Sequence, residues 1–172
     1  THGLKHVFVQ DGGWTQYAEL QLEQGVTSCL PTLFGPPEVV TEAMLRGRSE
    51  TDDLAATPNL LGFRLEMPYL AKPGAGQVSS LVGIREETTE DMWAASGCKV
   101  RIWDVSPELP YALPFICWAA EHGIVTSMAH TRATPDQARA AVDAGLSLVT
   151  HFYDTFDPPP QLDGGVYPAG VT

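Results

Sequence analysis

Three residues that lie far apart in the sequence have the chemistry of a divalent-metal site. His130 and His151 each follow a short apolar run, at residues 124–129 and 146–150. The carboxyl ends of consecutive parallel strands lie side by side, so both imidazoles can point into one site. A lone histidine at a strand end is more often structural, but imidazole is also a common zinc ligand. Because two consecutive strands both end in a histidine, a shared metal is an alternative to two separate structural histidines.

Glu66 is the candidate for a third ligand, because catalytic zinc usually has three protein ligands and one open position for water. In the predicted strand at residues 60–66, Phe63 and Leu65 alternate with Arg64 and Glu66. The two charged residues therefore share one face of the strand, at its carboxyl end. The alternative is a structural ion pair between Arg64 and Glu66.

The segment between the two histidines has the sequence of a helix. Thr134 can cap its amino end, Pro135 suits the first helical position, and Gln137 can complete a capping box. Gly145 can provide the left-handed residue that often ends a helix. This helix would connect the strand that ends at His130 to the strand that ends at His151.

The order of elements along the chain predicts a parallel α/β fold. Helices are expected at residues 15–24, 38–46, 86–95, 110–122 and from Pro135, and strands at 26–30, 60–66, 100–105, 124–130 and 146–151. Strands that alternate with helices form either an open doubly wound sheet or a (β/α)8 TIM barrel. No glycine-rich phosphate loop follows the first strand, which favours the barrel. We expect residues 1–172 to be a single partial catalytic barrel domain that contains only about strands 2 to 6.

Composition narrows the classes of partner. The chain of 172 residues is 44% hydrophobic and 18% charged, as expected for a soluble globular protein. Its net charge of −11 argues against nucleic acid and anionic membranes as partners. The three cysteines, Cys29, Cys98 and Cys117, lie in apolar runs and predict reduced core thiols in a cytoplasmic protein.

Four ordered segments resemble the N-acetylglucosamine-6-phosphate deacetylases of the amidohydrolase superfamily. Residues 62–70, GFRLEMPYL, are similar to that family's G-x-H-L-E-G-P segment. QGVTSCLPT and KVRIWDVSPE are similar to its second and fourth strands, and AHTRAT with VTHFYDTF to its two histidine motifs. The fold that this resemblance implies is a metal-dependent hydrolase barrel.

The resemblance also implies a reaction. Glu66, His130 and His151 would hold a divalent metal, with zinc expected, and the metal-activated water would hydrolyse an N-acetyl amide. An aspartate beyond Thr172 would be the general base. His2 is similar to part of an H-x-H signature, so a second ion is an alternative to a single one. The substrate would be a small-molecule amide such as an amino-sugar derivative, and the full-length protein a homo-oligomer.

Several departures from the family pattern fall where substrate contacts are expected. Arg64 replaces a histidine, and Gln77 or a neighbour stands where a sugar-contacting histidine would be. Asp154, beside Thr155, replaces an asparagine in the segment that normally helps to hold the substrate phosphate. A desolvated carboxylate there would repel a phosphate by several kcal/mol, roughly, at an effective dielectric near 20. We therefore expect Gln77, Asp154 and Thr155 to bind substrate, and whether the substrate is phosphorylated stays open.

Two other functions remain compatible with the sequence. A deaminase or cyclic-amide hydrolase of the same superfamily would use a similar metal site. A catalytically inactive barrel fragment could instead serve as a binding or assembly unit.

Overall fold

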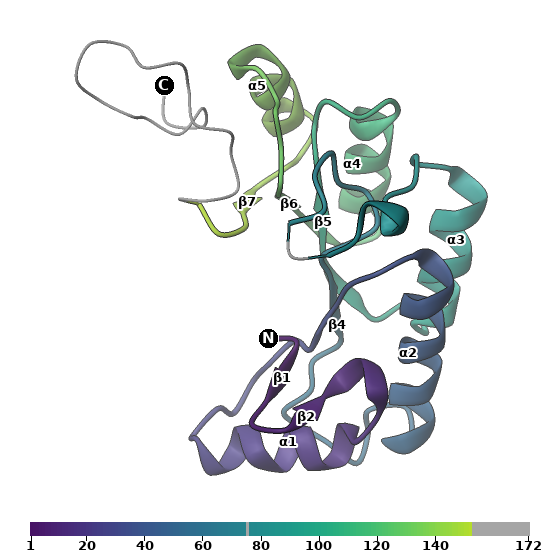
Figure 1. Cartoon of the computed structure of the whole chain (residues 1–172), viewed down its shortest axis with the longest axis vertical. Coiled ribbons are helices and arrows are strands. Elements are labelled where there is room, and N and C mark those ends of the chain that lie inside the picture. Colours follow the sequence, from purple (N-terminus) through teal and green to yellow (C-terminus); the bar gives the residue numbers. More distant parts are fainter. Residues whose placement is uncertain (75, 153–172) are drawn as a thin grey trace.

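The computed structural model describes residues 1–74 and 76–152. Its main sheet has five parallel strands that neighbour one another in chain order, β3-β4-β5-β6-β7 (Figure 1). A doubly wound sheet reverses its strand order at a switch point, whereas a (β/α)8 barrel does not. The order therefore agrees with the barrel prediction. The strands are β3 (Thr32–Leu33), β4 (Phe63–Leu65), β5 (Val100–Val105), β6 (Val125–Met128) and β7 (Leu148–Val149).

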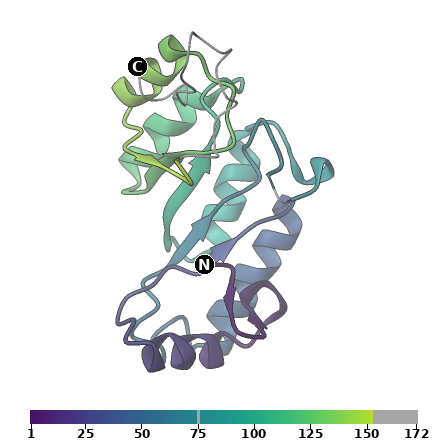
Figure 2. The ribbon, with the colours of Figure 1, turned by 60° about the vertical axis from the view of Figure 1, so that its left-hand side comes forward.

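Helices connect the strands, and those between β3 and β6 lie along one side of the sheet (Figures 1 and 2). The α-helices are α1 (Trp14–Glu23), α2 (Pro37–Glu50), α3 (Glu86–Ala95), α4 (Ala112–Glu121) and α5 (Pro135–Asp143). The short elements are the 3-10 turns η1 (Val9–Asp11) and η2 (Val78–Ser80) and an antiparallel pair, β1 (Gly3–Leu4) and β2 (Val7–Phe8). The sequence predicts strands only in alternation with helices, so the antiparallel β1–β2 pair was not expected.

The first strand of the sheet lies later in the sequence than predicted. Residues 26–30 are not a strand, and β3 begins only at Thr32. The amide of Val26 instead bonds the carbonyl of Gln21 and closes the end of α1. Cys29 forms an isolated bridge with Leu60, but Pro31 has no N–H for the ladder, so regular pairing starts after it.

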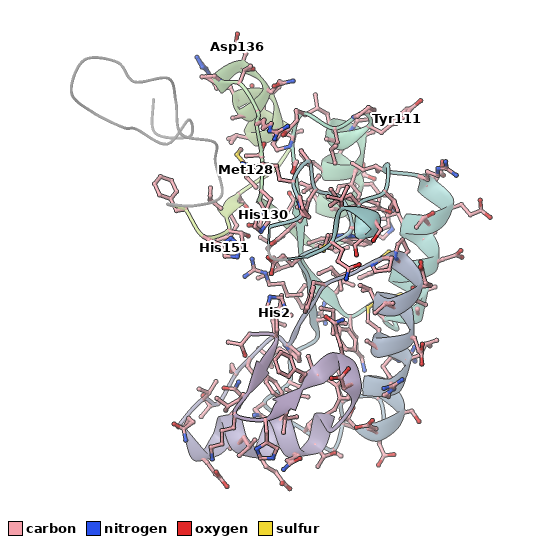
Figure 3. All side chains as sticks on the ribbon, viewed as in Figure 1. His2, Tyr111, Met128, His130, Asp136 and His151 are labelled. Atoms are coloured by element: carbon pink, nitrogen blue, oxygen red, sulfur yellow. The ribbon has the colours of Figure 1, made fainter. Side chains whose placement is uncertain are left out.

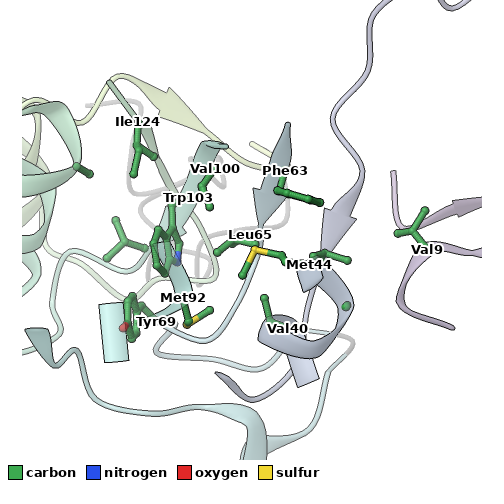
Figure 4. Packing of buried hydrophobic residues seen from close by; sticks show 14 of the residues in the cluster. Val9, Val40, Met44, Phe63, Leu65, Tyr69, Met92, Val100, Trp103 and Ile124 are labelled. Carbon is green, nitrogen blue, oxygen red and sulfur yellow. The ribbon is translucent and has the colours of Figure 1, made fainter. Parts of the chain in front are cut away.

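The hydrophobic core lies between the sheet and the helices (Figure 4). Phe63 and Leu65 are fully buried in it, as their alternation with charged residues predicts. Trp103 is also fully buried and stacks on Tyr69 with ring centroids 5.5 Å apart. Trp14, one residue before the predicted helix at residues 15–24, is the first residue of α1 and is fully buried.

The prediction of core thiols is wrong for two of the three cysteines. All three are free, but Cys98 and Cys117 are exposed and only Cys29 is half-buried. Hydrophobic neighbours in the sequence do not bury a residue that faces away from the sheet, as Cys117 does on α4.

The predicted capping box at α5 is confirmed. The Thr134 hydroxyl accepts from the amide of Gln137, and the Gln137 side chain accepts from the amide of Thr134. Among the described residues, the helices are all too short or too polar to cross a membrane.

Candidate metal centre

The structure brings Glu66, His130 and His151 together at the carboxyl ends of three strands. Glu66 directly follows β4, and each histidine comes two residues after the end of its strand, β6 or β7. One donor atom from each residue lies within 4.8 Å of the other two. Figure 3 shows both histidines on the side of the sheet away from α2 and α3. Residues separated by 64 and 85 positions from Glu66 thus share one site.

The spacing of the donor atoms fits a single small cation. Nε2 of His130 lies 3.1 Å from Oε1 of Glu66, and Nε2 of His151 lies 3.5 Å from the same oxygen. Two ligands at roughly 2.0–2.1 Å from a tetrahedral zinc would be about 3.3 Å apart. Both separations from Oε1 of Glu66 are therefore close to that between two ligands of one zinc ion.

Both histidines have an unusual backbone conformation. The φ angles of His130 and His151 are 43° and 34°, in the left-handed region that non-glycine residues rarely adopt. Such a conformation costs about 1–2 kcal/mol per residue and persists only where the surroundings enforce it. Strain of this kind gathers at functional sites, and here it turns both imidazoles from their strand ends toward Glu66.

The loop after β4 fits tightly around one of these rings. Gly74 has φ +56°, and a Cβ built there would lie 2.3 Å from Cε1 of His130. Only glycine can bring the backbone this close to the imidazole. Gly74 therefore limits the positions open to the ring.

Polar groups of the β5–α4 loop hold the backbone that carries His130. The Ser106 hydroxyl is 2.8 Å from the carbonyl of Ala129 and 3.2 Å from that of His130. The Glu108 carboxylate accepts hydrogen bonds from the Thr131 hydroxyl and from the backbone amide of Arg132. These contacts fix the segment on which the left-handed turn depends.

Glu66 is poised to be an anion. Burial by itself would raise the pKa of Glu66, but hydrogen bonds from His130 and His2, with the nearby His151, hold that pKa well below its usual range. A deprotonated carboxylate among imidazoles is the charge arrangement that a divalent cation requires.

His2 approaches the same carboxylate from the other side. Its Nε2 lies 2.9 Å from Oε2 of Glu66, and its Nδ1 lies 3.0 Å from the carbonyl oxygen of Thr32. A backbone carbonyl on one ring nitrogen is the usual way to leave the other nitrogen free as a ligand. His2 faces a different oxygen from the other two histidines.

Arg64 does not pair with Glu66, and the structural ion-pair alternative is therefore wrong. Its Nη2 instead lies 3.0 Å from Oδ2 of Asp104 and 2.6 Å from Oγ1 of Thr150. Burial raises the pKa of Asp104, although Arg64 and the Thr150 hydroxyl favour its charged form. Asp104 was not among the predicted site residues, although a carboxylate inside a largely apolar strand, which needs a buried partner, was an available signal.

Of the three predicted substrate residues, the structure describes only Gln77. Gln77 is exposed just before η2, where its Oε1 lies 3.4 Å from the Ser79 hydroxyl. Asp154 and Thr155 lie outside the described residues.

Comparisons with known proteins agree with the resemblance found in the motifs. No family model matches the chain. The N-acetylglucosamine-6-phosphate deacetylase of Lysinibacillus sphaericus is 26% identical over 159 residues, which are 91% of this chain and 41% of that protein. That of Bos taurus is 30% identical over 149 residues, which are 84% of this chain and 36% of that protein. The chain thus spans less than half the length of these relatives.

A solved structure shows the same fold. The N-acetyl-D-glucosamine-6-phosphate deacetylase from Mycobacterium smegmatis aligns with a TM-score of 0.84 at 24% identity, over 99% of this chain and 45% of that one. The protein is therefore a five-strand portion of a (β/α)8 barrel, with histidines and a carboxylate at the carboxyl ends of its strands. The particular proteins that it resembles are the N-acetylglucosamine-6-phosphate deacetylases, as the ordered motifs predicted.

Proposed function

We propose that the chain is the metal-binding portion of an amidohydrolase that removes an acetyl group from a small amino-sugar derivative. The observation that carries the proposal is the meeting of Glu66, His130 and His151 within 4.8 Å at three strand ends. The carboxyl ends of barrel strands are where such enzymes build their active sites. The relatives from Lysinibacillus sphaericus and Bos taurus are deacetylases of an amino-sugar phosphate, which supplies the reaction class.

Glu66, His130 and His151 would hold one divalent ion, and zinc suits their nitrogen and oxygen donors. When bound, such an ion lowers the pKa of a water molecule and polarises an amide carbonyl. Other residues of the chain hold the ligands in place. Glu66 supplies the negative charge, and Gly74 and the Ser106 hydroxyl constrain the ring and backbone of His130. His2 is available for a second ion on the other side of Glu66.

The general base and the substrate contacts remain predictions. The resemblance assigns the base to an aspartate that would follow Thr172. It assigns substrate contacts to Gln77, Asp154 and Thr155, and a carboxylate at Asp154 argues against a phosphate nearby. The cytoplasmic location, a homo-oligomeric state and the extent of the domain over residues 1–172 also remain predictions.

Metal analysis tests the proposal directly. We expect the purified protein to bind about one equivalent of zinc and His130→Ala to lose it. His122→Ala is the matched control, because His122 lies at the end of α4, stacked on Trp118. This variant should leave the zinc content unchanged. Equal zinc content in all three proteins, or none in the parent, would contradict the proposed site.

Acetate release then tests the reaction. We expect the full-length protein to release acetate from an N-acetylated amino sugar, and to lose this activity in His130→Ala but not in His122→Ala. Comparing the 6-phosphate with the free sugar tests the inference from Asp154. A normal rate of acetate release from the phosphorylated sugar would show that Asp154 does not exclude a phosphate.

A further inference from the structure

A polar network crosses the face of the sheet that lies away from α2 and α3, beside the candidate metal centre. Nη2 of Arg64 lies 3.0 Å and 3.2 Å from the two carboxylate oxygens of Asp104. The Thr150 hydroxyl accepts from Arg64 at 2.6 Å and donates to Asp104 at 3.0 Å. Because a hydroxyl has only one proton, Ser127 must be the donor in its 2.7 Å contact with Thr150. The network thus joins four strands, β4 to β7.

Each end of this network is close in sequence to a candidate ligand. Arg64 lies in β4, two residues before Glu66, which directly follows that strand, and Thr150 directly precedes His151. Ser127 lies three residues before His130. Contacts among these side chains therefore restrain the separation of the strand ends that carry the ligands.

Strand β7 is short and pairs with β6 at Ser127–Leu148 and Met128–Val149. It has two residues, Leu148–Val149, and the backbone bonds that flank it are Ser147 to Thr126 at 3.3 Å and Thr150 to Met128 at 2.9 Å. The hydroxyl bonds of Thr150 add to these backbone contacts at the residue directly before His151. The left-handed φ of 34° at His151 adds to the need for an anchor.

Stability alone does not explain the ion pair. The Asp104 side chain is fully buried and that of Arg64 is 23% exposed. The Arg64 Nε is buried with no hydrogen-bond partner among the described residues. Replacing a buried ion pair by apolar residues is often neutral or stabilising, whereas removing one partner is costly. A pair that stability does not require is best explained by the geometry that it imposes.

We propose that Arg64, Asp104 and Thr150 are positioning residues that set the distance between Glu66 and His151 and thereby the affinity of the site for a divalent cation. None of them touches the ion. Asp104 also neutralises the guanidinium of Arg64, which would otherwise repel a cation beside Glu66. The inference rests on the proposed function, because it requires that the site bind a metal.

Zinc affinity, measured by competition with a chromophoric chelator, and urea unfolding test the proposal together. Thr150→Val keeps the side-chain shape and the ion pair but removes the anchoring hydroxyl. We expect zinc to bind 10- to 100-fold more weakly, the usual effect of losing a supporting contact. Thr89→Val is the matched control, since it removes a hydroxyl that bonds Tyr69 on the outer side of the sheet at 2.8 Å. It should leave zinc affinity unchanged.

A double variant separates positioning from stability. Arg64→Met with Asp104→Leu removes both charges together, so its urea midpoint should stay close to that of the parent while zinc affinity falls by a similar factor. Parent-like zinc affinity in Thr150→Val or in the double variant would overturn the inference and leave the proposed site intact. A parent protein that binds no zinc would instead overturn the proposed function, and with it this inference.

Discussion

Gly74→Ala should weaken metal binding without touching a ligand. The added Cβ would lie 2.3 Å from Cε1 of His130, which is about 1.1 Å inside the 3.4 Å at which ordinary contact begins. The ring or the loop must therefore move by about that distance. Metal–ligand distances are held to about 0.2 Å, so the displacement is large for a ligand. We expect a loss of zinc affinity on the order of 10- to 100-fold, as for other contacts that orient a ligand.

Gly123→Ala is the control that isolates the contact. Gly123 has a similar left-handed φ, +70° against +56°, but a Cβ there would meet nothing within 4 Å. A left-handed alanine costs about 1–2 kcal/mol in both variants, and the overlap with His130 adds to that cost in Gly74→Ala, so urea unfolding should show at least as large a loss for Gly74→Ala as for Gly123→Ala. Chelator competition should then distinguish them, with only Gly74→Ala binding zinc more weakly. Equal zinc affinity in the two variants would refute the argument that Gly74 constrains His130.

Three further predictions concern stability. Gly47→Ala should lower the free energy of unfolding, because its Cβ would lie 2.7 Å from the Trp14 ring; overpacking costs about 1–3 kcal/mol and outweighs a gain of about 1 kcal/mol in helix propensity. Thr134→Ala should cost about 1 kcal/mol in urea unfolding through loss of the cap of α5, and no change would contradict the capping box. Burial raises the pKa of Tyr69, so the stabilising contribution of its neutral phenol is present below pH 10 and is lost as the pH rises above that. Tyr69→Phe should therefore reduce the alkaline decline in the urea midpoint, and it should cost about 1 kcal/mol at neutral pH because the hydrogen bond to Thr89 is lost.

Local patterns predicted those elements whose signals lie within a few residues. The bounds of α3 and β5, at residues 86–95 and 100–105, are as predicted. Thr134 and Gln137 likewise identified the start of α5. Strand β3 was misplaced because its position depends on pairing with β4 and on the way in which Val26 closes α1, and neither is local.

The sequence by itself determined which side chains could share a metal, because parallel strands that alternate with helices must bring their carboxyl ends to one edge. Glu66, His130 and His151 followed from that topology without any knowledge of distances. Only the tertiary structure decided the partner of Arg64, since the register between β4 and β5 brings Asp104 beside it and no spacing in the sequence specifies that register. The left-handed backbone of the two histidines was likewise settled by the loops that pack around them.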